Sequence, residues 1–125
     1  MESGLYWVLG FVAVAAIAYF LFRPKRGSST DLVSSLQRGA LLLDVRSPSE
    51  FADGHVEGAR NVPVDAVQSA IDSLGEKTQP IVVYCRSGAR SAQAARLLMA
   101  AGYSDVVNGG SVSAVRSAKQ AASVS

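Results

Sequence analysis

The sequence predicts an α/β domain with a mainly parallel sheet flanked by helices, preceded by one transmembrane helix. Two observations lead to this fold class. An uncharged apolar run of helical length lies at residues 5–22. After it, short apolar runs of strand length alternate with segments of helical spacing, which is typical of parallel sheets. We therefore expect an anchor with a basic flank over 1–26, a tether over 27–29 and the domain over 30–125.

The run at residues 5–22 reads LYWVLGFVAVAAIAYFLF. As a helix it would be about 27 Å long, close to the hydrocarbon thickness of a bilayer, roughly 30 Å. Tyr6, Trp7 and Tyr19 fall near its ends, where aromatic rings favour the membrane interface. A cleaved signal peptide is the alternative, but bulky residues lead directly into the basic flank with no small-residue cleavage site. The anchor is the favoured interpretation.

The charge distribution predicts the orientation of this span. The chain has a net charge of +2, and the excess comes from three basic residues between 23 and 26, since the 99 residues after them are neutral. Basic residues beside a span stay on the cytoplasmic side. We expect a single-pass protein with its N-terminus outside and its catalytic domain in the cytoplasm, on the inner membrane if the source is bacterial. The neutral domain argues against nucleic-acid binding.

The domain is expected to contain helices and strands in alternation. Helices are predicted from a Thr30 cap to Gly39, at 64–74, 89–101 and 112–122, with a shorter one starting at 47–51. Strands are predicted at 40–45, 60–63, 81–84 and 105–108. The segment 60–63 would lie at an edge, because a proline ends it.

The candidate site follows the clearest strand, 81–84, which ends directly at Cys85. Open α/β sheets place ligands at this carboxyl edge. Gly88 permits a sharp turn into the next helix, and the turn's amides would form an anion-binding concavity to which Arg86 and Arg90 add charge. The only cysteine of the chain excludes a disulfide framework and a cysteine-cluster metal site. An inert core cysteine is the alternative to a reactive one.

The thiol would need activation to act as a nucleophile. A free cysteine has a pKa of about 8.5, so roughly 3 % is thiolate at pH 7. Lowering that pKa by about two units would make roughly three quarters of it thiolate, and helix N-termini and neighbouring cations supply shifts of this size.

Several motifs occur together in one order. They are Asp44–Phe51, Gly54–Pro63, Tyr84–Ser91, Gly102-Tyr103 and Asn108–Gly110. In this order they resemble the rhodanese domain of sulfurtransferases, over roughly residues 30–118. The family's tryptophan after Asn-Gly-Gly is absent, which leaves the packing of the last helix open.

The resemblance implies a thiosulfate-type sulfurtransferase. Cys85 would take sulfane sulfur as a persulfide from a small anionic donor and pass it to a thiol or to cyanide. The loop that would hold the sulfur comprises Arg86, Ser87, Gly88, Ala89 and Arg90, and both arginines would attract the donor. No metal or organic cofactor is expected.

Four residues have supporting interpretations. Asp44 is expected to accept hydrogen bonds from loop amides, and His55 to fix a turn. Arg46 and Glu50, four positions apart, are candidates for an ion pair. His55 is the only histidine and has no companion ligands, which argues against a metal site.

Two other functions compete with this one. The first is that of related cysteine phosphatases, whose loop follows a wider Cys-x5-Arg pattern. Here the spacing from Cys85 to Arg90 is Cys-x4-Arg, which gives a smaller loop that suits one sulfur atom. The second is a membrane-tethered persulfide carrier or docking module for a membrane-protein partner, with little small-molecule turnover. Its anchor would contact the lipid bilayer.

Overall fold

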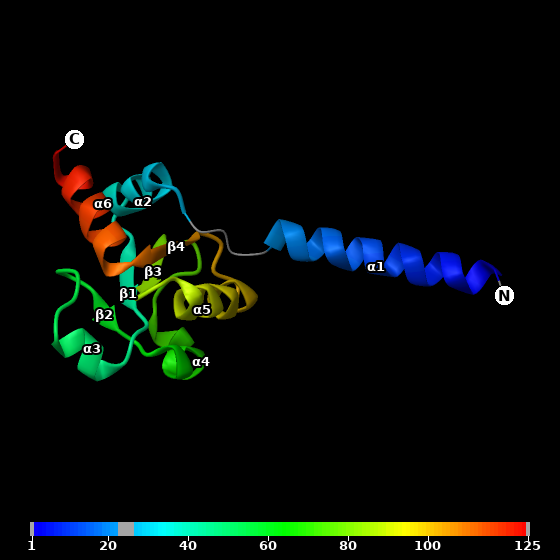
Figure 1. Ribbon diagram of the computed structural model, residues 1–125, viewed down its shortest axis with the longest axis horizontal. Helices are drawn as coiled ribbons and strands as arrows, with labels where there is room; N and C mark the ends of the chain where they lie inside the picture. The colour runs from blue at the N-terminus through cyan, green and yellow to red at the C-terminus, as the bar shows by residue number, and fades with distance from the viewer. Residues whose placement is uncertain (1, 23–26, 125) are drawn as a thin grey trace.

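The computed structural model describes residues 2–22 and 27–124, and in the first helix the side chains of residues 4–18. Four parallel strands form one sheet in the order β2-β1-β3-β4 (Figure 1). They are β1 (Leu41–Asp44), β2 (Arg60–Asn61), β3 (Ile81–Cys85) and β4 (Val106–Ser111). The parallel sheet predicted from the alternating pattern is therefore confirmed, with β2 at one edge, as predicted, and β4 at the other.

Helices cover both faces of the sheet. On one face lie α2 (Ser29–Gln37) and α6 (Val112–Val124), and on the other lie α4 (Val67–Ala70) and α5 (Ala89–Ala100) (Figure 1). The short helix α3 (Pro48–Ala52) follows β1. Successive strand residues point to opposite faces, so neighbouring β3 residues supply two separate cores. Val82 packs with the α2 and α6 side, and Val83 packs with the α4 and α5 side.

Two helix predictions need correction. The cap of α2 is Ser28 rather than Thr30, because Ser28 and Asp31 form a reciprocal capping box. The predicted helix 64–74 is divided into a 3-10 turn (Val64–Ala66), α4 and a second 3-10 turn (Ile71–Ser73).

The tether predicted at 27–29 packs against the domain. The Gly27 amide donates to the carbonyl of Asn108 at 3.0 Å. A Cβ on Gly27 would collide with Val107, so this residue lies directly against β4. Gly27 therefore belongs to the folded domain rather than to a free tether.

The helix predicted over 5–22 is present as α1 (Glu2–Phe22). The crossing of a membrane is not supported: among the residues that the structure describes, no helix is long and apolar enough to do so. The basic flank at 23–26 lies outside the described residues, as do the side chains of 19–22.

Candidate active site

Cys85 is the last residue of β3, the strand that lies between β1 and β4. All five residues of β3 are buried, and Cys85 is 0 % exposed. It pairs with Ser111 of β4, while on the other side the Val45 amide donates to the Tyr84 carbonyl at 3.0 Å. The thiol therefore sits at the carboxyl edge of the sheet, where the sequence predicts it.

A tight turn leads from Cys85 into α5. Gly88 has φ +103°, the left-handed conformation that glycine adopts without a steric penalty, and it forms the N-cap of α5. Its amide donates to Cys85 Sγ at 2.9 Å. The turn thus directs a backbone N–H at the sulfur, as the anion-binding interpretation requires.

Two polar side chains beside the thiol complete its surroundings; both lie in motifs noted in the sequence, but neither was predicted to be a site residue. Ser91 Oγ lies 3.3 Å from Cys85 Sγ, and the same hydroxyl donates to Asn108 Oδ1 at 2.7 Å. Asn108 in turn accepts from the Gly110 amide at 3.0 Å and donates to the Gly88 carbonyl at 3.2 Å. Both Ser91 and Asn108 are buried.

The pKa of the Cys85 thiol is lowered from its ordinary value. Burial is the largest influence and raises it, since a thiolate is poorly solvated there. Hydrogen bonds from the Ser91 hydroxyl and from the amides of Ser91, Gly88 and Ser87 lower it, and the net shift of the pKa is downward. The sequence predicts activation by a helix N-terminus and neighbouring cations, and these amides belong to the loop and to the first turn of α5.

The two arginines of the loop have different surroundings. Arg90 forms two bonds with Glu50, Nη1 to Oε1 at 2.7 Å and Nη2 to Oε2 at 3.0 Å. Arg86 is exposed and its guanidinium makes no ion pair with the described residues. Arg90 is therefore engaged by Glu50, whereas Arg86 is exposed and has no ion-pair partner among the described residues.

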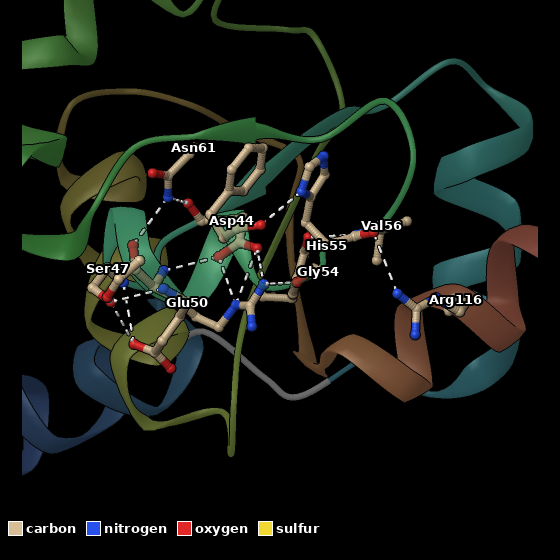
Figure 2. Close-up of polar contacts among 12 residues, drawn as sticks. Asp44, Ser47, Glu50, Gly54, His55, Val56, Asn61 and Arg116 are labelled. Atoms are coloured by element: carbon tan, nitrogen blue, oxygen red, sulfur yellow. Dashed lines mark hydrogen bonds and ion pairs between the residues drawn. The ribbon is translucent and has the colours of Figure 1, made fainter.

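The ion pair suggested between Arg46 and Glu50 is not formed, because both residues have other partners. Arg46 bonds to Asp44 through Nη2 and Oδ2 at 2.7 Å, among the contacts drawn around Asp44 in Figure 2. Both side chains are buried. Arg46 also donates to the Gly54 carbonyl at 2.8 Å. Asp44 accepts from the Arg46 amide at 3.0 Å, as expected of a residue that binds loop amides.

His55 lies beside the end of α3. Its Nδ1 is 2.8 Å from the Phe51 carbonyl, and its ring stacks on the Phe51 ring with centroids 3.6 Å apart (Figure 2). The carbonyl of His55 accepts from Arg116 of α6. These contacts stabilise the turn after α3, in agreement with the structural interpretation of this histidine.

A cavity of about 440 Å³ opens beside the loop. Its polar lining comes from Ser47, Asp65 and Arg90, and its apolar lining includes Val45. Val45 and Cys85 belong to the same core cluster, so the cavity lies on the thiol's side of the sheet.

Known proteins resemble this chain in sequence and in fold. Residues 28–116 match the rhodanese-like domain family. A sulfurtransferase of Allochromatium vinosum is 41 % identical over 68 residues, covering 54 % of this chain and 63 % of the relative. The thiosulfate sulfurtransferase PspE of Escherichia coli is 38 % identical over 69 residues, covering 54 % and 66 %.

Solved structures agree with these matches. A rhodanese with anions from E. coli superposes with a TM-score of 0.58 at 34 % identity, covering 61 % of this chain and 91 % of that one. The human single-domain sulfurtransferase TSTD1 gives 0.60 at 32 % identity, covering 66 % and 86 %. The first curated relatives are covered over only 56 % to 66 % of their length. The family match spans most of the present chain, which therefore belongs to the rhodanese-like domain family.

Proposed function

We propose that this chain is a sulfurtransferase that carries sulfane sulfur on Cys85 as a persulfide. The observation that carries the proposal is the thiol at the carboxyl edge of the sheet with the Gly88 amide donating to it at 2.9 Å. Family relatives named thiosulfate sulfurtransferases support a donor of the thiosulfate type.

The first step is attack of the Cys85 thiolate on the outer sulfur of thiosulfate. A sulfur–sulfur bond forms to Sγ, the sulfur–sulfur bond of thiosulfate breaks, and its electron pair leaves with sulfite. The product is the Cys85 persulfide anion. Amides from Arg86 to Arg90 would surround its terminal sulfur, because the left-handed turn at Gly88 directs backbone N–H groups inward.

The second step regenerates the thiolate. An acceptor such as cyanide or a thiolate attacks the terminal sulfur, and the electron pair of the breaking bond returns to Sγ. With cyanide the product is thiocyanate, so neither step needs an external oxidant or reductant. We place the reactants in the cavity beside Arg90, and the exposed Arg86 would draw the anionic donor toward it.

The test of this proposal is the intact mass of the chain after incubation with thiosulfate. We expect the gain of one sulfur atom, reversed by a reductant, and no gain in Cys85→Ser. Ser91→Ala is a matched control that removes a polar group beside the thiol but leaves the nucleophile, so it should still take up sulfur. An unmodified wild-type chain would overturn the proposal.

A persulfide carrier for a protein partner is the second candidate. The complete burial of Cys85 favours small reactants over a protein surface, because a large partner has less access to a buried sulfur. Steady-state turnover with thiosulfate and cyanide separates the two functions. Repeated thiocyanate formation supports the enzyme, whereas a stable persulfide with negligible turnover supports the carrier.

We further propose that residues 5–22 bring the domain to a lipid bilayer, with the N-terminus outside and the domain in the cytoplasm. All described side chains of α1, residues 4–18, are exposed, including Trp7 at 81 % and Phe11 at 77 %. An exposed apolar surface of this kind marks a site of contact with a membrane or a partner. The basic residues at 23–26 support the orientation.

Membrane fractionation of the full chain tests this localisation. Wild type should stay in the pellet after an alkaline wash, whereas Val14→Lys/Ile17→Lys should be released. Val124→Lys, at an exposed apolar position of α6, is the matched control and should behave as wild type. Release of the wild type would contradict membrane insertion. A reporter that fluoresces only in the cytoplasm should be bright after Ser125, and a dark fusion would reverse the orientation.

A further inference from the structure

The Cys85 thiol contacts a chain of two side chains whose hydrogen-bond directions are fixed by the backbone. Asn108 lies between two backbone groups, with Oδ1 3.0 Å from the Gly110 amide and Nδ2 3.2 Å from the Gly88 carbonyl. An amide N–H only donates and a carbonyl only accepts. These two contacts therefore determine which atom of the Asn108 amide is oxygen.

The Ser91 hydroxyl can donate one hydrogen bond, and it donates this bond to Asn108. Ser91 Oγ is 2.7 Å from Asn108 Oδ1, an atom that cannot donate. The oxygen lone pairs of Ser91 then face Cys85 Sγ at 3.3 Å, where a hydrogen bond forms only if the sulfur carries the proton. The Gly88 amide already donates to Sγ, so Ser91 is the acceptor for the S–H group.

We propose that Ser91 and Asn108 form a relay whose direction depends on the protonation of Cys85, with Asn108 as a positioning residue. In the thiol state the hydrogen bonds run from Cys85 to Ser91 and from Ser91 to Asn108. When the thiol releases its proton to solvent, the Ser91 hydroxyl turns from Asn108 to the thiolate. Each thiolate formed therefore costs the Ser91–Asn108 hydrogen bond.

The relay also distinguishes the two sulfur states, a consequence that rests on the proposed function. In a persulfide the negative charge resides on the terminal sulfur, and Sγ is neutral. The Ser91 hydroxyl is then free to return to Asn108. The relay thus favours the thiol and the persulfide over the free thiolate between them.

The charged groups around the thiol come from four segments of the chain. Arg90 of α5 is paired with Glu50 of α3, and Arg86 lies on the loop. At the end of β1, Asp44 is paired with the nearby Arg46. These ion pairs do not involve Ser91 or Asn108, so they stay the same whichever way the Ser91 hydroxyl points. Substitution of Asn108 therefore leaves the charges around the thiol unchanged.

The test is the pH dependence of Cys85 alkylation by iodoacetamide, a neutral reagent, on the full chain in detergent. Asn108→Ala removes the competing acceptor and leaves the Ser91 hydroxyl free for the thiolate. We expect the midpoint to fall by roughly half to one pH unit, the size of one neutral hydrogen bond. In a chain that already carries Ser91→Ala, the same substitution should leave the midpoint unchanged.

Asn61→Ala is the matched control. Asn61 also ties loop backbone together, donating to the carbonyls of Asp44 and Arg46 at 3.0 Å each, but it has no bond to Ser91. It should leave the alkylation midpoint unchanged. The relay would be overturned if Asn108→Ala shifted the midpoint equally with and without Ser91→Ala, or if it raised the midpoint or left it unmoved.

If Asn108→Ala does not fold, Asn108→Asp supplies the same comparison. Its carboxylate holds the Ser91 hydroxyl more strongly, so the midpoint should rise more when Ser91 is intact than when Ser91→Ala is also present. An equal rise would reflect charge alone and would contradict the relay. Alkylation requires no sulfur transfer, so the two proposals can fail separately. If the alkylation midpoints behave as expected but thiosulfate adds no sulfur, the proposed function has failed. If thiosulfate adds sulfur but the midpoints do not behave as expected, the relay has failed.

Discussion

Glu50 and Arg90 join helix α3 to the first turn of α5 through two hydrogen-bonded contacts, at 2.7 Å and 3.0 Å. Ser47, the N-cap of α3, donates from its amide and its hydroxyl to the same carboxylate. The Cys85 loop is therefore braced by a carboxylate from a different segment of the chain, and both side chains of the ion pair remain about one-third exposed.

This ion pair predicts a pH-dependent contribution to stability. The Arg90 bond, followed by the Ser47 amide, lowers the pKa of Glu50 from 4.5 to about 2. A carboxyl with a depressed folded-state pKa stabilises the fold fully above its unfolded pKa and loses that contribution as the pH falls through the folded one. The contribution is therefore present above pH 4.5 and lost toward about pH 2.

Glu50→Gln should accordingly have a lower Tm than wild type above pH 4.5, with the difference closing as the pH approaches about 2. Thermal unfolding followed by circular dichroism across this range measures it. Glu76→Gln, in the exposed loop before β3, is the control and should follow wild type. A difference that stays constant down to pH 2 would contradict the assignment.

The Asp44–Arg46 pair predicts a much larger effect, because it is buried. Asp44→Ala leaves the Arg46 guanidinium buried without its carboxylate, which costs about 3–5 kcal/mol. Chemical denaturation measures the loss. The exposed pair Arg38–Asp105 supplies the control: Asp105→Asn should change the free energy of unfolding little, since water solvates both partners. Equal losses would show that burial does not determine the cost.

Much of the fold could be predicted from local patterns. The segments 40–45 and 81–84 are apolar runs, the first interrupted only by Asp44, as central parallel strands require, and both are present as strands. The segment 64–74 is helical as predicted, but only residues 67–70 form an α-helix, with a 3-10 turn on either side. Its apolar residues at 64, 67, 70, 71 and 74 recur three and four apart, which fits an α-helix, so the spacing did not indicate the 3-10 turns.

The polar network of the site could not be predicted in this way. Glu50 and Arg90 are 40 residues apart, and they meet only because the parallel topology places their helices at one edge of the sheet. Asn108 reaches Ser91 beside an irregularity in β4, where Val83 pairs with Asn108 but Tyr84 pairs with Gly110. The skipped Gly109 has no space for a side chain, since a Cβ there would collide with Val115.

The turn at Gly88 predicts a loss of both stability and sulfur loading in Gly88→Ala. A left-handed alanine costs about 1–2 kcal/mol. Space is not the obstacle, because the added Cβ would meet only Gly110 Cα at 3.6 Å. We expect slower uptake of sulfur from thiosulfate, since relaxation of the strained turn would move the Gly88 amide away from Sγ.

Gly39→Ala is the matched control for this substitution. Gly39 has φ +79°, open space around a Cβ, and a position after α2, away from the thiol. It should show a comparable loss of stability with wild-type loading. If both variants load sulfur at the same rate, the Gly88 amide has no role at the thiol.

The exposed Arg86 predicts a specific dependence on the charge of the donor. Arg86→Ala should raise the KM for thiosulfate about three- to tenfold, the size of one lost charge acting on a dianion across a few ångströms of water. Added salt should narrow the difference, because it screens exposed charges. Arg96→Ala, which removes an exposed arginine farther along α5, should leave the KM near wild type. Both variants should react with neutral iodoacetamide at the wild-type rate. If Arg86→Ala lost alkylation and thiosulfate binding to the same extent, Arg86 would support the loop rather than attract the donor.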